Sequence, residues 1–136
     1  MVKQGFHIGD RDWWVMGTYG IDGERDLYEV YEALLSIGIP DYKARKVCME
    51  LSKPNSGYTL TDFGRHFTLM FVSRATSAEQ MFDSVVHELK HLTEHIGAYY
   101  GVDPEEELSA YLQGEVGRKM WPAVALVLCP ECRGRL

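Results

Sequence analysis

The segment from Ser77 to Gly101 reads S-AEQMFDSVVHELKHLTEHIGAYY-G and decides the fold. Ser77, followed three residues later by Gln80, is a capping box that opens a helix predicted over residues 78–100. Apolar side chains recur on one face of this helix at the helical period. They are Met81, Phe82, Val85, Leu89, Leu92 and Ile96. This face is predicted to pack on the core, which leaves the opposite face for polar side chains.

The polar face carries His87-Glu88-Leu89-Lys90-His91, a match to the pattern HExxH. Two histidines four residues apart lie one turn apart on a helix, so both imidazoles can reach one zinc ion. Glu88 points about 100° round the helix from His87, close enough to hold a water molecule without ligating the metal. A shuffled chain of this composition would contain roughly 0.016 such matches. The spacing therefore predicts His87 and His91 as zinc ligands and Glu88 as a general base.

A third protein ligand is expected, because a catalytic zinc ion keeps three and leaves one position for water. The next helix is predicted to start at Asp103-Pro104 and to run to about residue 119, antiparallel to the first. Its first turn holds three consecutive glutamates, Glu105, Glu106 and Glu107. We expect Glu107 to be the ligand, because it shares a face with small residues that let the two helices approach. The alternative is that the glutamates only complement the helix dipole.

Other side chains near the predicted metal have weaker roles. Glu94 and His95 lie near the metal face of the histidine helix, but residues a further turn along are poorly placed to ligate the same ion. Glu94 is expected to accept a hydrogen bond from an imidazole N–H, and His95 to border the cleft. Tyr111, His95 and Tyr100 are the candidates for stabilising an oxyanion.

The rest of the chain predicts an α+β fold with a small antiparallel sheet packed on helices. Strands are expected at 13–19, 58–62 and 66–73, the last two joined tightly through Phe63-Gly64. Helices are expected at 27–37 and 40–53, each ended by turn residues. The tail, 121–136, shows no clear period.

Composition points to one globular domain over residues 1–136. The chain is 46% apolar and 25% charged, which excludes a disordered protein. A net charge of −6 argues against a nucleic-acid partner. The longest apolar run, at 123–129, is far short of the ~20 residues of a membrane span. With no apolar segment near the N-terminus to suggest export, a cytoplasmic location is expected.

The three cysteines are too few for a disulfide framework. Cys129 and Cys132 form a CxxC pair in the tail, which is half of a structural zinc site. Three interpretations stay open: two reduced thiols, a zinc site shared between two copies of the chain, and a redox pair. Cys48 is the only other cysteine that could join them.

The motif followed by Glu107-Leu-Ser-Ala110-Tyr111-Leu112 resembles the gluzincin branch of zinc metallopeptidases. It is most similar to small intracellular ImmA/IrrE-like and phage-encoded HExxH domains, over about residues 66–116. The resemblance implies a zincin-like fold, zinc held by His87, His91 and Glu107, and Glu88 as the base. It also implies a peptide or protein substrate that lies along an edge strand, within residues 66–73. The CxxC pair resembles the zinc knuckle of SprT-like proteases, but no histidine after His95 matches their third ligand.

Two functions follow as expectations. The first is a zinc-dependent metallopeptidase in which Glu88 activates water for attack on a peptide bond. The second is a non-catalytic zinc-binding regulatory or protein-interaction domain with the same fold. A retained Glu88 favours the enzyme, because a purely structural zinc site needs no general base.

Overall fold

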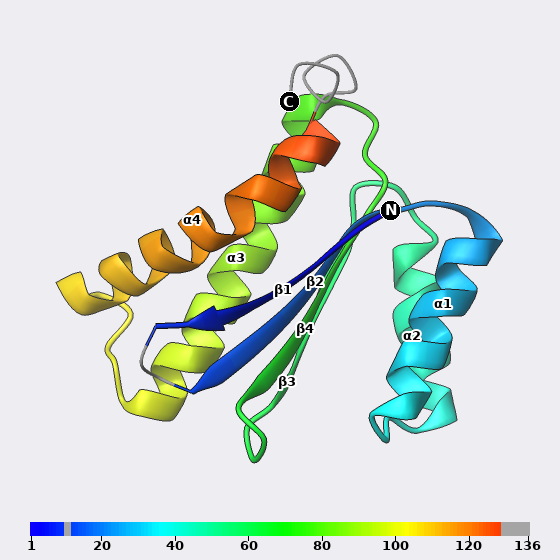
Figure 1. Cartoon of the computed structure of the whole chain (residues 1–136). Helices are drawn as coiled ribbons and strands as arrows, with labels where there is room; N and C mark the ends of the chain where they lie inside the picture. The colour runs from blue at the N-terminus through cyan, green and yellow to red at the C-terminus, as the bar shows by residue number, and fades with distance from the viewer. Residues whose placement is uncertain (10–11, 129–136) are drawn as a thin grey trace.

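The computed structural model describes residues 1–9 and 12–128. In chain order its elements are β1 (Val2–Ile8), β2 (Trp13–Ile21), α1 (Gly23–Ser36), α2 (Asp41–Leu51), β3 (Gly57–Asp62), β4 (Phe67–Ser73), α3 (Ala78–Tyr100) and α4 (Glu107–Leu128). The four strands form one sheet in the order β1-β2-β4-β3, with helices on both faces (Figure 1). The predicted α+β class is confirmed.

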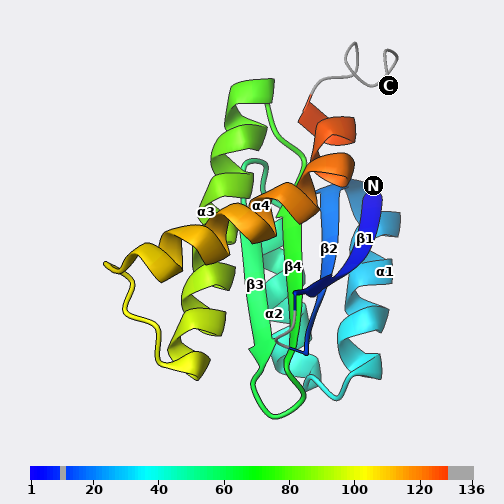
Figure 2. The ribbon, with the colours of Figure 1, turned by 60° about the vertical axis from the view of Figure 1, so that its left-hand side comes forward.

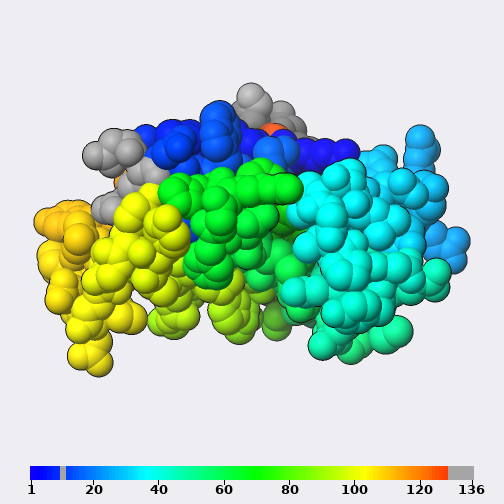
Figure 3. All heavy atoms as spheres, turned by 90° about the horizontal axis from the view of Figure 1, so that it is seen from below, coloured from blue at the N-terminus to red at the C-terminus, as the bar shows by residue number. Residues whose placement is uncertain are grey.

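The sheet separates two apolar cores. On one face α1 and α2 pack around Leu34, Val47 and Phe71. On the other face α3 and α4 cover a larger core that includes Val15 and Leu92, and α4 crosses in front of the sheet (Figure 2). Seen from below, the β3–β4 connection lies between the C-terminal end of α3 and the α1–α2 pair (Figure 3). The molecule thus has three layers, with the sheet in the middle.

The prediction of an antiparallel sheet is wrong in one pairing. β1 pairs with β2 and β3 pairs with β4 in antiparallel fashion, but β2 and β4 are parallel neighbours. The chain leaves β2 through α1 and α2, forms β3 on the outside, and returns as β4 between β2 and β3. The sheet is therefore mixed.

This order also corrects the expected edge strand. Residues 66–73 were expected to border the substrate, but β4 is an inner strand with neighbours on both sides. Its side chains are buried on both faces of the sheet from Thr68 to Ser73, as an inner strand requires. The edge strand on this side is β3.

The long helix α3 has the bounds that the sequence predicts. The Ser77 hydroxyl accepts a hydrogen bond from the Gln80 backbone N–H at 3.1 Å, so the N-cap is formed. At the other end Gly101 adopts the left-handed conformation, with φ of 71°. Most of the predicted apolar face is buried, but Phe82 is exposed.

Helix α4 differs from its prediction at both ends. It begins at Glu107, because Asp103 closes a local turn instead, in which its carboxylate accepts from the Glu105 backbone N–H at 2.9 Å. It continues through Pro122 to Leu128, although proline interrupts the helical hydrogen bonds. The residues after the proline, Ala123 to Ala125, are buried against the core, which stabilises the last turns.

Strand β1 was not predicted. Only Phe6 and Ile8 of its seven residues are buried. The alternation of apolar and polar residues that signals a strand is therefore weak in this segment. It is held from outside the sheet by α4, since the Gln4 side-chain amide donates to the Lys119 carbonyl at 2.5 Å. Among the described helices, none is long and apolar enough to cross a membrane.

Candidate metal centre

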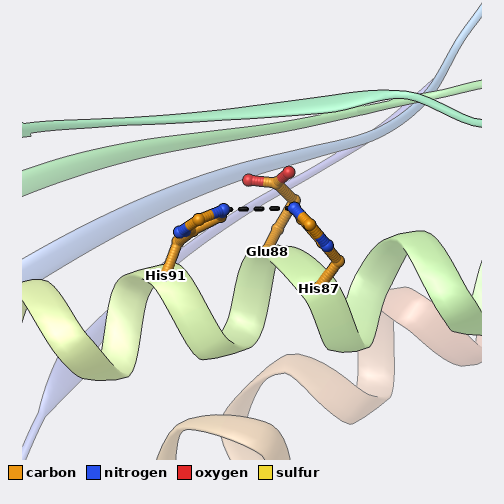
Figure 4. A group of neighbouring side chains, drawn as sticks. All are labelled: His87, Glu88 and His91. Carbon is orange, nitrogen blue, oxygen red and sulfur yellow. Dashed lines mark hydrogen bonds between the residues drawn. The ribbon is translucent and has the colours of Figure 1, made fainter.

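Helix α3 places the histidine pair on its exposed side. The imidazoles of His87 and His91 lie one turn apart, with their Nε2 atoms 3.1 Å apart (Figure 4). Both side chains are exposed to solvent, and they extend from the same side of α3 as Glu88. The spacing of the motif therefore produces the convergence that the sequence predicts.

Glu88 differs from the two histidines in its burial. Its residue is only 3% exposed, and its carboxylate points toward the sheet. The Thr59 hydroxyl of β3 donates to Glu88 Oε2 at 2.5 Å. The Glu88 side chain is thus buried between α3 and β3, where a charge-assisted hydrogen bond compensates part of the cost of burial.

Gly57 of β3 makes room for that carboxylate. A Cβ at this position would lie 2.7 Å from both Cγ and Oε1 of Glu88. A Cβ atom essentially never approaches another atom this closely, so only glycine fits here without movement of the strand or the carboxylate. The close approach of β3 to α3 depends on this residue.

The three motif side chains form one group. One ligand atom from each of His87, Glu88 and His91 lies within 4.8 Å of the others, which makes the group a candidate metal site. Among the described residues no further histidine, cysteine, aspartate or glutamate joins it. The group opens into a hollow between α3 and β3 whose lining residues are Gly57, Tyr58, Thr59, His87, Glu88, His91 and His95.

His95 is the one candidate oxyanion stabiliser that lines this hollow. Its Nδ1 lies 2.8 Å from the Thr61 hydroxyl of β3, and its ring centroid is 6.3 Å from that of His91. Burial lowers the pKa of His95, the charge of His91 lowers it further, and Glu94 opposes both. The neutral imidazole is therefore favoured.

The structure does not bring Tyr111 or Tyr100 into the hollow. Tyr111 lies on α4 and is 69% exposed. Tyr100 lies at the end of α3 in an aromatic cluster, with its ring centroid 6.1 Å from that of Trp13 and 6.4 Å from that of His66.

Glu107 and Glu94 also lie outside the group. Glu107 is the exposed first residue of α4 and does not line the hollow. As a metal ligand it stays a prediction. Glu94 forms an ion pair with Lys90 at 3.2 Å, one turn away on α3.

The cysteines do not add to the described site. Cys129 and Cys132 lie outside the described residues. Cys48 is half-buried in the α1–α2 layer, where its thiol donates to the Leu27 carbonyl at 3.5 Å. Burial raises the pKa of this thiol, which keeps it protonated.

Sequence reasoning missed the contribution of β3, namely Gly57, Thr59 and Thr61. Gly57 lies just before the strand that the sequence predicts at 58–62, among the turn residues that follow the helix predicted at 40–53. The alternation Thr59-Leu60-Thr61 was a usable signal, since it places both threonines on one face of a strand. Comparison of the chain with models of protein families, with curated proteins and with solved structures finds no match.

Proposed function

We propose that the protein is a zinc-dependent peptidase in which His87 and His91 hold the metal and Glu88 is the general base. The observation that carries the proposal is the convergence of one ligand atom from each of these residues within 4.8 Å. It is strengthened by the different surroundings of the three side chains. Two exposed imidazoles are available to an ion, while the carboxylate is buried and hydrogen-bonded beside them.

The donor set fits zinc. Zinc bonds to imidazole nitrogen at about 2.0–2.1 Å, so two nitrogens in a tetrahedral site lie about 3.3 Å apart. The separation of 3.1 Å between the Nε2 atoms of His87 and His91 is close to that value.

Bound zinc supplies a Lewis acid that polarises a carbonyl group and lowers the pKa of coordinated water toward about 7. Glu88 accepts a proton from the attacking water and passes it to the leaving amine. The Thr59 hydroxyl holds one carboxylate oxygen of Glu88, which leaves Oε1 to take the proton. The hydrogen bond from Thr59 and the close packing of Gly57 would limit the movement of this carboxylate during the step.

A peptide is the proposed substrate because of the strand beside the hollow. β3 pairs with β4 on one side only, and it is the edge of the sheet. Its residues Gly57 to Thr59 line the hollow together with the histidines. An extended peptide can pair with a free strand edge through main-chain hydrogen bonds, which would lay its backbone across the hollow.

A second candidate function is a zinc-binding module without turnover. It is favoured by one observation, that Glu88 is the only carboxylate in the described structure that joins the histidine pair. If Glu88 were the third ligand, it would not be available as a base. The two candidates therefore assign different roles to the same side chain.

Glu88→Gln separates these candidates, because it keeps the shape of the side chain and removes its charge. If Glu88 is the base, the variant keeps zinc affinity within about threefold and loses cleavage of a peptide library by about 10²–10⁴-fold. If Glu88 is a ligand, zinc affinity falls in the variant and the wild-type chain cleaves nothing. Glu94→Gln is the matched control, since Glu94 lies on the same helix outside the hollow. Cleavage by Glu88→Gln at the wild-type rate would refute the proposal.

A further inference from the structure

A chain of side-chain hydrogen bonds runs from the core to the hollow. It begins at Trp13, whose indole Nε1 lies 3.0 Å from the Thr68 hydroxyl. The Thr68 and Thr61 hydroxyls are 3.0 Å apart, and Thr61 Oγ1 lies 2.8 Å from His95 Nδ1. Trp13 and Thr68 are fully buried. The chain therefore links an interior residue of β2 to a ring that lines the hollow.

The chemistry of the first member fixes the direction of the first two bonds. An indole N–H can only donate, so the Thr68 oxygen accepts from Trp13. The Thr68 hydroxyl proton then needs an acceptor, and Thr61 is its remaining partner among the described residues. With the reverse direction, this proton would be buried without an acceptor, which proteins avoid. Once Thr61 accepts from Thr68, its own proton is free to be donated, and His95 Nδ1 is the other side-chain partner of this hydroxyl among the described residues.

We infer that Trp13, Thr68 and Thr61 hold His95 as the neutral tautomer with its proton on Nε2. Nδ1 accepts the Thr61 proton, so it carries no hydrogen of its own. In a neutral imidazole the hydrogen is then on Nε2, which has no partner among the described residues. His95 thus offers the hollow a hydrogen-bond donor and not a metal ligand, because Nε2 can ligate only after it loses that proton. Trp13, Thr68 and Thr61 are positioning residues.

The ligand that fits such a donor is a carbonyl oxygen or an oxyanion. His95 lines the same hollow as His87 and His91. If the proposed peptidase function holds, on which this role rests, the donor is available to the oxygen of the carbonyl group under attack. The tautomer itself depends on no metal, so it can be tested separately.

Nitrogen NMR of the metal-free full-length chain, labelled with ¹⁵N-histidine and held above the imidazole pKa, tests the tautomer. We expect the His95 proton on Nε2 and an Nδ1 shift typical of a hydrogen-bond acceptor. Thr61→Val should move the Nδ1 shift toward that of a free imidazole nitrogen, whereas the matched Thr61→Ser should not. A proton on Nδ1 in the wild-type chain would overturn the inference. So would an Nδ1 shift that Thr61→Val leaves unchanged.

Zinc titration of His95→Gln tests the second half of the inference. If His95 is a donor and not a ligand, the variant should bind zinc with an affinity within about threefold of wild type. Loss of a ligand should lower zinc affinity by more than about 100-fold, because loss of a residue that only hydrogen-bonds a ligand already lowers it by about 10–100-fold. A loss of that size would make His95 a ligand and overturn the assignment. Failure of the wild-type chain to bind zinc would instead refute the proposed function and its role for His95, and the tautomer would still be decided by the NMR spectra.

Discussion

At the residue scale, Glu88 and the two histidines are neighbours on one helix but have different surroundings. The histidines are exposed, and Glu88 is buried against β3. One step along α3 turns the side chain by about 100°, which takes Glu88 from the exposed face of His87 to the sheet. There it meets Gly57 and the Thr59 hydroxyl. The carboxylate is held by β3, while the imidazoles are held by α3 alone.

Gly57→Ala tests this packing. The added methyl group would lie 2.7 Å from Glu88 Cγ, so the strand or the carboxylate must move. We expect the free energy of unfolding to fall by about 1–3 kcal/mol, as for other overpacked sites, in urea denaturation followed by circular dichroism. Gly114→Ala is the control, since a Cβ there meets nothing within 4 Å, and it should leave stability unchanged or raised. An unchanged stability in Gly57→Ala would contradict the packing.

The sequence predicts the motif residues of this site and misses their partners. His87, Glu88 and His91 are close because helical geometry places residues i and i+4 together, and that geometry is local. Gly57 and Thr59 are about thirty residues away along the chain. Their contact with Glu88 depends on the order of the strands in the sheet, which places β3 next to α3. No local pattern contains that information.

At the element scale, the sequence predicts the helices better than the order of the strands. The capping box and apolar stripe of α3 gave its bounds, whereas the end of α4 was missed because the tail shows no clear period, and Pro122 is in addition a local signal for termination. Burial of the residues after the proline outweighs it. The inner position of β4 could have been predicted from its continuous apolar run, Leu69 to Val72, which suits a strand covered on both faces.

Glu107→Gln tests the placement of α4. Glu107 lies outside the hollow, at the exposed start of that helix, so we expect the variant to keep the zinc affinity of wild type. Isothermal titration of metal-free protein with zinc measures this, with Glu106→Gln as the control. A fall of more than about tenfold in Glu107→Gln alone would mean that the first turn of α4 reaches the histidines, as the sequence predicts.

At the scale of the whole molecule, the sheet isolates the candidate site from one of the two cores. The hollow is built by α3 and β3, and α3 packs on the larger core. The α1–α2 layer lies on the opposite face (Figure 1). This layer should therefore contribute to stability without shaping the metal ligands.

Leu34→Ala tests that separation. Leu34 of α1 is fully buried, so its truncation should lower the free energy of unfolding by about 2–5 kcal/mol. Zinc affinity, measured at a temperature where the variant is folded, should stay within about threefold of wild type. Leu92→Ala is the comparison in the other core, adjacent in sequence to His91. If Leu34→Ala weakened zinc binding as much as Leu92→Ala, the two layers would not be independent.

The central claim is that His87 and His91 together bind a zinc ion. The most direct measurement is a zinc titration of the metal-free chain, with the His87→Ala and His91→Ala variants titrated under the same conditions. We predict a site in the wild-type chain that each substitution weakens by more than about 100-fold, because each removes a ligand. Equal zinc binding by the wild type and both variants, or no binding by the wild type, would contradict the claim.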